Sequence, residues 1–194
     1  MATQFNVAGF TSTINKLGLA NPNKFKVDIA FPSKLEGIGG TGTLRNLSLM
    51  CESISIAGRG VQTILDLQYG LRKEIVYNAP VYNPITLSFL CSSELKEKQL
   101  LDKWNNFIVP NNNGKGFDVG YYKDYTGTIT VYLLDSDGNT VKYTQTYMEA
   151  YPKTVNAIEL NHSTTNSVAR ITADFQYAYW NPIGKWNTGE IGHT

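Results

Sequence analysis

The fold of this chain is decided by Pro84-Ile-Thr-Leu-Ser-Phe-Leu-Cys91, which runs directly into Ser92-Ser-Glu-Leu-Lys-Glu-Lys-Gln-Leu-Leu-Asp-Lys-Trp-Asn-Asn-Phe107. The first part alternates apolar and polar residues, which is typical of a half-buried strand. In the second part Leu100, Trp104 and Phe107 fall at i, i+4 and i+7, which predicts an amphipathic helix over about 93–108 with Ser93 as its N-cap. We expect these three side chains to pack the helix onto a sheet.

The sequence on both sides of this helix has the alternating pattern of β-strands. One strand is predicted at Phe25–Phe31, and another through Leu49–Ile56 with a bulge near Glu52-Ser53, where the apolar phase slips by one residue. Asp135-Ser-Asp-Gly138-Asn predicts the turn of a hairpin, and a last long strand is expected from Ile171 to Tyr179. Residues 6–20 place Phe10, Ile14 and Leu17 at helical spacing, so a short N-terminal helix is expected.

Composition limits the classes of function. The 194 residues suit a single domain, and 42% hydrophobic residues can form a core. The formal net charge of +1 argues against a protein that works by neutralising phosphates. No apolar run is long enough to span a bilayer, and the start lacks the pattern of a signal peptide, so we expect a soluble protein made in a cytoplasm, with no membrane partner.

The two cysteines, Cys51 and Cys91, lie in apolar strand patterns. We predict buried, reduced thiols, because free cysteine usually serves as a small apolar side chain. The sequence leaves a disulfide between them open.

No motif for catalysis, metal or cofactor binding is complete in the sequence. The glycine-rich stretch at 33–44 lacks the Lys-Ser/Thr of a phosphate-binding loop, and it leads into a strand. Asp135-Ser-Asp-Gly138 lacks the closing glutamate of a calcium loop. The two histidines, His162 and His193, have no partners at metal-ligand spacing. We therefore predict no enzyme activity, no metal and no cofactor.

The order of elements resembles that of the tail tube proteins of contractile-tailed bacteriophages. The resemblance covers roughly residues 20–180. It rests on the bent strand at Leu49–Arg59, the strand before the helix, Tyr125-Thr-Gly-Thr-Ile-Thr-Val-Tyr-Leu-Leu-Asp135, and Ala150-Tyr-Pro-Lys-Thr-Val-Asn-Ala-Ile-Glu-Leu160, interpreted as a turn between strands. The chain departs from the family at 33–44 and after Trp180.

The resemblance implies a fold, an assembly and partners. The expected fold is a mainly β, antiparallel barrel or sandwich flanked by one helix, with an N-terminal arm at 1–22, the domain at 23–180 and a tail at 181–194. The resemblance also implies hexameric rings that stack into a hollow tube inside a contractile sheath, with double-stranded DNA passing transiently through it. The implied partners are further copies of the chain, the sheath protein, and baseplate and tail-terminator proteins, in the tail of a virion.

Two sets of residues are candidates for roles in such an assembly. The extended excursion at about 55–84 is the candidate ring-to-ring contact, because an arm without its own core suits an interface and Arg and Tyr are favoured there. Its candidate residues are Arg59, Arg72, Lys73, Tyr77 and Tyr82. The polar face of the last strand, Thr172, Asp174 and Gln176, is the candidate lumen wall.

Three alternatives stay open at this stage. The chain could initiate a tube at a baseplate, or form the tube of a phage-like injection system. A β-barrel nucleic-acid-binding module is the alternative of another class, and the balanced charge disfavours it. An enzyme would need a site assembled from scattered residues.

Overall fold

The computed structural model describes residues 6–35, 47–66, 70, 72–78, 80–110, 118–161, 163 and 168–183. Its elements are, in chain order, α1 (Val7–Leu17), β1 (Phe25–Ala30), β2 (Cys51–Ile54), β3 (Thr63–Asp66), β4 (Lys73–Val76), β5 (Ile85–Leu90), α3 (Lys96–Ile108), α4 (Tyr122–Tyr125), β6 (Gly127–Leu134), β7 (Val141–Val155), β8 (Arg170–Gln176) and β9 (Tyr179–Ile183). Most of the glycine-rich stretch, and both histidines, lie outside the described residues.

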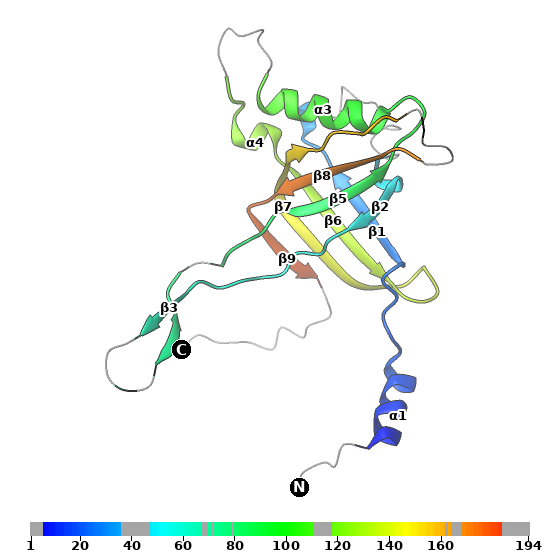
Figure 1. The fold of residues 1–194 in the computed structure, drawn as a ribbon, viewed down its shortest axis with the longest axis vertical. Coiled ribbons are helices and arrows are strands. Elements are labelled where there is room, and N and C mark those ends of the chain that lie inside the picture. Colours follow the sequence, from blue (N-terminus) through cyan, green and yellow to red (C-terminus); the bar gives the residue numbers. More distant parts are fainter. Residues whose placement is uncertain are drawn as a thin grey trace.

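One antiparallel sheet, in the order β1-β6-β7-β8-β5-β2, forms the body of the molecule, and β9 pairs with β7 beside this path. The first part of β7 pairs with β9 through Thr144–Met148, and the last part pairs with β8 from Tyr151 onward. Between the two parts Glu149 adopts a left-handed φ of 55°. The strand therefore bends there, and the sheet folds over into two layers (Figure 1).

The predicted class, mainly β and antiparallel, is confirmed. Of the two predicted forms, a barrel or a sandwich, the described residues do not form a closed barrel. In the described part of the chain β1 and β2 are the two ends of the pairing path, so the sheet stays open between them. The core fills the space between the two layers. It includes Val27, Ile85, Leu87, Phe89, Ile129, Val131, Tyr147, Ile171, Ala173 and Phe175.

Helix α3 lies across one end of the two layers (Figure 1). Leu100 and Trp104 are buried as expected, whereas Phe107 is only half-buried. The Trp104 ring packs against Phe31 at 4.7 Å between ring centroids, and its Nε1 donates to the Tyr125 carbonyl at 2.8 Å. Gly127 lies beside the indole, and a Cβ there would stand 2.3 Å from the Ala30 carbonyl oxygen. This position therefore requires glycine.

The start of α3 differs from the prediction. The helix begins at Lys96, and its N-cap is Leu95, in a left-handed conformation with a φ of 52°, instead of the predicted Ser93. Ser92 supports the helix start from outside, because its Oγ accepts from the Lys96 N–H at 3.3 Å. Glu97 accepts hydrogen bonds from both the Ser92 N–H, at 2.9 Å, and the Ser92 Oγ, at 2.8 Å. These bonds satisfy the buried Glu97 carboxylate, which the apolar pattern alone did not reveal as a buried group.

The bulge and the hairpin turn are confirmed. The β2–β5 register shifts between Cys51 and Ser53. In the turn between β6 and β7 the Gly138 N–H donates to the Asp135 carbonyl at 2.8 Å, and Gly138 has a φ of 72° that favours glycine.

Two strand predictions are wrong. The segment around Pro152, expected to be a turn, is the end of β7, because the bend at Glu149 carries the strand from one layer to the other. The expected last strand divides at Tyr177-Ala178 into β8 and β9, and β9 reaches Ile183, beyond the predicted start of the tail at 181. Residues 184–194 lie outside the description.

Candidate assembly surfaces

The β3–β4 hairpin projects from the body as an arm, as the sequence predicts (Figure 1). Two long connections lead to it, and Gly60 and Val81 form a single bridge between them. Exposed aliphatic side chains gather on the arm. They are Val61, Ile64, Leu65, Ile75 and Val76. Because a two-stranded hairpin alone is marginally stable in water, this exposed apolar surface makes the arm a candidate interaction surface.

The structure brings together most of the predicted contact residues. Arg72 and Tyr77 flank β4, Lys73 opens it, and all three are exposed. Arg59 is exposed on the connection that leads into the arm. Tyr82 differs, because it is half-buried and its ring packs against Tyr177 at 5.8 Å between centroids. Tyr82 therefore belongs to the attachment of the arm to the body.

Two inward-facing side chains of β7 hold the base of the arm at Ala57. The Tyr147 Oη accepts from the Ala57 N–H at 3.0 Å, and the Gln145 Nε2 donates to the Ala57 carbonyl at 3.4 Å. Both side chains are buried, and burial raises the pKa of Tyr147 to about 12, so its hydroxyl stays protonated at neutral pH. Sequence reasoning missed this clamp because its members lie about 90 residues apart.

The body presents two polar sheet faces. Thr172, Asp174 and Gln176 do share one face of β8, where the Thr86 Oγ1 of the neighbouring β5 donates to Asp174 at 2.6 Å. The second face lies on the layer of β1, β6, β7 and β9. There the hydroxyls of Thr130 and Thr146 lie 3.5 Å apart and Lys26 pairs with Asp28 at 2.9 Å. The alternation of threonine with Ile129 and Val131 in β6 is the sequence signal for this threonine face, which was not among the predicted sites.

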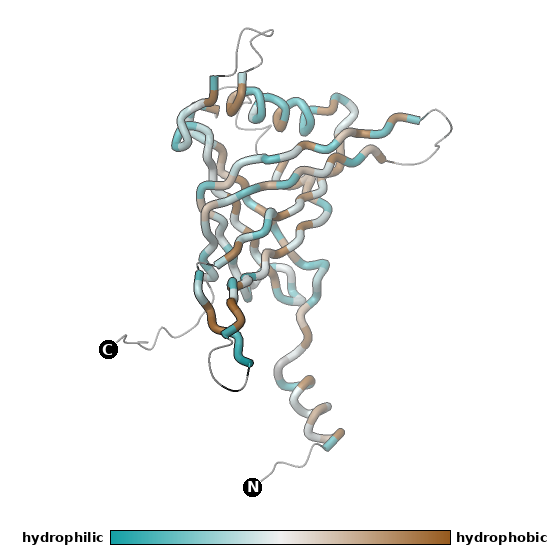
Figure 2. The backbone as a smooth tube through the Cα atoms, turned by 60° about the vertical axis from the view of Figure 1, so that its left-hand side comes forward, coloured by the Kyte–Doolittle hydropathy of each residue, from teal (hydrophilic) through white to brown (hydrophobic). Residues whose placement is uncertain are grey.

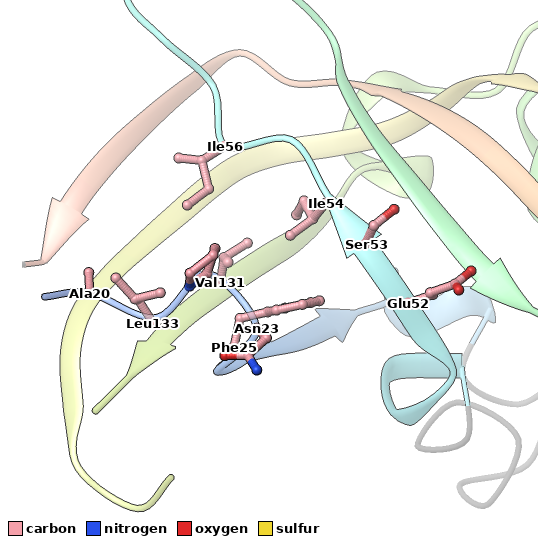
Figure 3. Close-up of a pocket in the computed structure, with 10 residues that line it drawn as sticks. Ala20, Asn23, Phe25, Glu52, Ser53, Ile54, Ile56, Val131 and Leu133 are labelled. Atoms are coloured by element: carbon pink, nitrogen blue, oxygen red, sulfur yellow. The ribbon is translucent and has the colours of Figure 1, made fainter. Parts of the chain in front are cut away.

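An apolar groove of about 530 Å³ opens between the two ends of the pairing path, β1 and β2 (Figure 3). Phe25 of β1 and Val131 and Leu133 of β6 form one wall, and Ile54 and Ile56 form the other. The groove lies near the end of β6, whereas Gly127 lies at its start. At Gly127 the Trp104 ring closes the core. The two layers are thus closed by α3 at one end and open at the other.

The described residues contain no arrangement typical of catalysis at these surfaces. Among them no group of three or more His, Cys, Asp or Glu side chains could hold a metal ion. Cys51 and Cys91 are free, half-buried thiols, and burial raises the pKa of Cys51 to about 12, which favours the neutral thiol over the thiolate at neutral pH. None of the helices in the described part of the chain has the length and apolar character to cross a membrane.

Comparison with known families decides the identity of the fold. The sequence profile of the family described as "Phage tail tube protein" matches residues 20–182, which begin after α1 and extend into β9. The chain belongs to the phage tail tube protein family. The role of the family is structural, so the chain is a subunit of a tail tube. No curated protein sequence matches the chain.

Solved structures share the fold of this tail tube protein. A chain of the extracellular contractile injection system PVC sheath–tube complex in the extended state is 17% identical, with a TM-score of 0.61 over 90% of this chain and 97% of that one. A chain of the anti-feeding prophage baseplate is 13% identical, with a TM-score of 0.60 over 86% and 97%. A chain of the anti-feeding prophage tube-terminating cap is 15% identical, with a TM-score of 0.58 over 94% and 93%. At these identities the likeness concerns the fold.

Proposed function

We propose that this tail tube protein assembles into hexameric rings, and that the rings stack into a hollow conduit for double-stranded DNA inside a contractile sheath. The observation that carries this proposal is the four-stranded antiparallel layer β1-β6-β7-β9, which ends in an unpaired strand edge on each side within the described residues. Open edges are sites at which another chain can add its strands.

The number of strands in this layer suits a ring. Because four antiparallel strands are an even number, β1 and β9 run in opposite directions. A second copy rotated about a ring axis then places its β1 antiparallel to the β9 of the first copy. Repetition of this head-to-tail contact continues one antiparallel sheet around a closed ring and leaves no open edge in that sheet.

The threonine face of the same layer is our first candidate for the lumen wall. If β9 and β1 of successive copies join, this face becomes continuous around the ring. Neutral hydroxyls and a net charge of +1 suit a conduit, since a wall rich in Lys and Arg would hold the DNA backbone. The face predicted from the sequence, Thr172, Asp174 and Gln176, is the alternative wall.

The β3–β4 arm is the proposed contact between stacked rings. Its exposed aliphatic side chains supply an apolar surface, and Arg72 and Tyr77 supply side chains of types that are enriched at interfaces. Lys73 adds an exposed positive charge beside them. Arg59 extends this surface towards the body, while Tyr82 fixes the arm from beneath. The proposed further partners are a sheath protein, a baseplate and a tail terminator, in a tail whose subunits are made in the host cytoplasm.

A tube-initiating protein of a baseplate, or the tube of an injection system, is the second candidate. It is favoured by the fold likeness to chains from a baseplate and a cap as well as from a sheath–tube complex. An initiator would stop at a single ring, whereas a tube subunit would polymerise.

Sedimentation velocity of the purified chain over a range of concentrations tests the proposal. We expect material of hexamer mass or larger that grows with concentration. A species fixed at hexamer mass would favour the initiator, and a monomer at every concentration would contradict self-assembly into rings.

A further inference from the structure

The apolar groove between β1 and β2 and the N-terminal helix α1 are both incomplete in the single chain. The groove is lined by apolar side chains, among them Ile56, which is 48% exposed. Helix α1 stands apart from the body in two views (Figures 1 and 2). Each feature thus has an apolar surface that the body of its own chain leaves open.

Helix α1 is amphipathic, with apolar side chains along one side. Val7, Phe10 and Ile14 fall at i, i+3 and i+7 and form one apolar stripe, and Val7 is 72% exposed. The Asn6 side chain caps the helix by accepting from the Ala8 N–H at 2.9 Å. A helix of 11 residues is marginal by itself in water, so its stripe is expected to gain stability from a packing partner.

The segment between α1 and β1 holds α1 away from the groove of its own chain. The Leu134 N–H donates to the Lys24 carbonyl at 2.8 Å, and Asn21 reaches Ser136 in the β6–β7 turn at 3.4 Å. Ala20 and Asn23 themselves line the groove, and the chain leaves from its rim (Figure 3). The same segment that forms part of the groove wall therefore directs α1 outward.

We propose that the groove of each chain receives helix α1 of a second copy, so that neighbouring subunits are linked by exchanged N-terminal arms. The helix is about 16 Å long. It presents aliphatic and aromatic side chains to a groove with a mostly apolar lining, in which Asn23, Glu52 and Ser53 are the polar residues. The only charged residue of the helix is Lys16 in the last turn. The β3–β4 hairpin is a poorer occupant, because its strands carry Asp66, Lys73 and Glu74.

The contact is heterologous, because a helix of one copy meets a groove of the next. Such contacts propagate head to tail and close into rings or continue along a stack. The inference rests on the self-assembly proposed above and adds to it a specific link between subunits.

Cysteine cross-linking between differently tagged chains tests the exchange. In a Cys51→Ser, Cys91→Ser background, one chain carries Ile14→Cys and the other Ile56→Cys, and the two are mixed, assembled and oxidised. We expect a disulfide-linked pair that carries both tags. The matched control replaces Ile56→Cys by Leu160→Cys, an exposed apolar position outside the groove, and is expected to give little product.

A second measurement uses charge substitutions on α1 in chains that keep Cys51 and Cys91. Val7→Glu puts a charge on the apolar stripe and should raise the concentration needed for assembly about tenfold or more. Ser12→Glu adds the same charge to the opposite side of α1 and should leave assembly unchanged.

Several outcomes would overturn the exchange while leaving the proposed function intact. The first two are assembly without the disulfide cross-link, and a cross-link to Leu160→Cys that is as strong as the one to Ile56→Cys. The third is a disulfide that forms only within a single chain carrying both Ile14→Cys and Ile56→Cys. The fourth is a disulfide from Ile56→Cys that forms preferentially to Ile64→Cys in the hairpin of another chain. Chains of the native sequence that stay monomeric at every concentration would contradict both proposals.

Discussion

The Tyr147 Oη accepts a hydrogen bond from the Ala57 N–H at 3.0 Å, across 90 residues of sequence. This bond joins the buried centre of β7 to the segment from which the β3–β4 arm departs. The position of the arm is therefore fixed by the core, although the arm itself is exposed.

Replacement Tyr147→Phe should lower the free energy of unfolding by about 1–3 kcal/mol, because it leaves the Ala57 N–H without its acceptor. Chemical denaturation measures this change, and hydrogen exchange should show faster exchange of the Ala57 amide. Tyr132→Phe, which removes a half-buried hydroxyl from the neighbouring strand β6, is the control. Equal exchange rates at Ala57 in both variants would argue against the clamp.

Replacement Trp104→Ala should destabilise the chain by about 3–5 kcal/mol, because the indole is fully buried and donates to the Tyr125 carbonyl. Thermal or urea unfolding measures the loss. Trp104→Phe keeps most of the ring packing against Phe31 and should cost less. A near-native stability for the alanine variant would refute the packing of α3 onto the sheet.

Ionisation of Glu97 should make the free energy of unfolding depend on pH in the acidic range. Burial alone would raise its pKa. The hydrogen bonds from Ser92 and from the Glu97 N–H, together with the nearby charge of Lys96, outweigh burial and hold the pKa below the ordinary value of 4.5. The ionised carboxylate therefore stabilises the fold above about pH 4.5, and this contribution is lost as the pH falls through the lower pKa of the folded state. Urea unfolding of Glu97→Gln should show reduced stability at pH 7 and a smaller loss on acidification. An identical acid dependence in both proteins would contradict this role.

The double variant Arg59→Glu, Arg72→Glu should block the stacking of rings and leave single rings intact, since both side chains are exposed on the arm and its connection and neither belongs to β1 or β9. Native mass measurement and electron microscopy distinguish rings from tubes. Lys103→Glu, Lys153→Glu makes the same change of charge at exposed positions elsewhere and should stack normally. Unaltered tubes from the arm variant would exclude the arm as the ring-to-ring contact.

Single cysteines on the two polar faces should identify the lumen wall. In a background without native cysteines, Thr130→Cys in assembled tubes should react with a small maleimide and resist a large polyethylene-glycol maleimide. Thr172→Cys should react with both. The reverse pattern would place the lumen on the β8 face, as the sequence analysis predicted.

The sequence was sufficient for those elements whose partners are close along the chain or whose pattern is regular. The stripe through Leu100 and Trp104 predicted α3, the phase slip at Glu52-Ser53 predicted the bulge, and Asp135–Gly138 predicted the hairpin turn. In each case the local pattern and the final packing require the same residues.

The sequence was not sufficient where distant strands determine the conformation. Pro152 favours a turn in isolation, but β8 pairs with this segment and keeps it in β7. The regular alternation from Ile171 to Tyr179 hides the division at Tyr177-Ala178, because β9 leaves β8 to pair with the first part of β7. The groove between β1 and β2 depends on a path of sheet pairing that no local pattern contains.

Negative-stain electron microscopy of the purified chain over a concentration series, with native mass measured alongside, tests the central claim most directly. The tail tube account predicts six-fold rings at low concentration and hollow, stacked tubes at high concentration. Particles that remain monomeric throughout, together with salt-dependent binding of single-stranded DNA, would contradict it and favour a nucleic-acid-binding module.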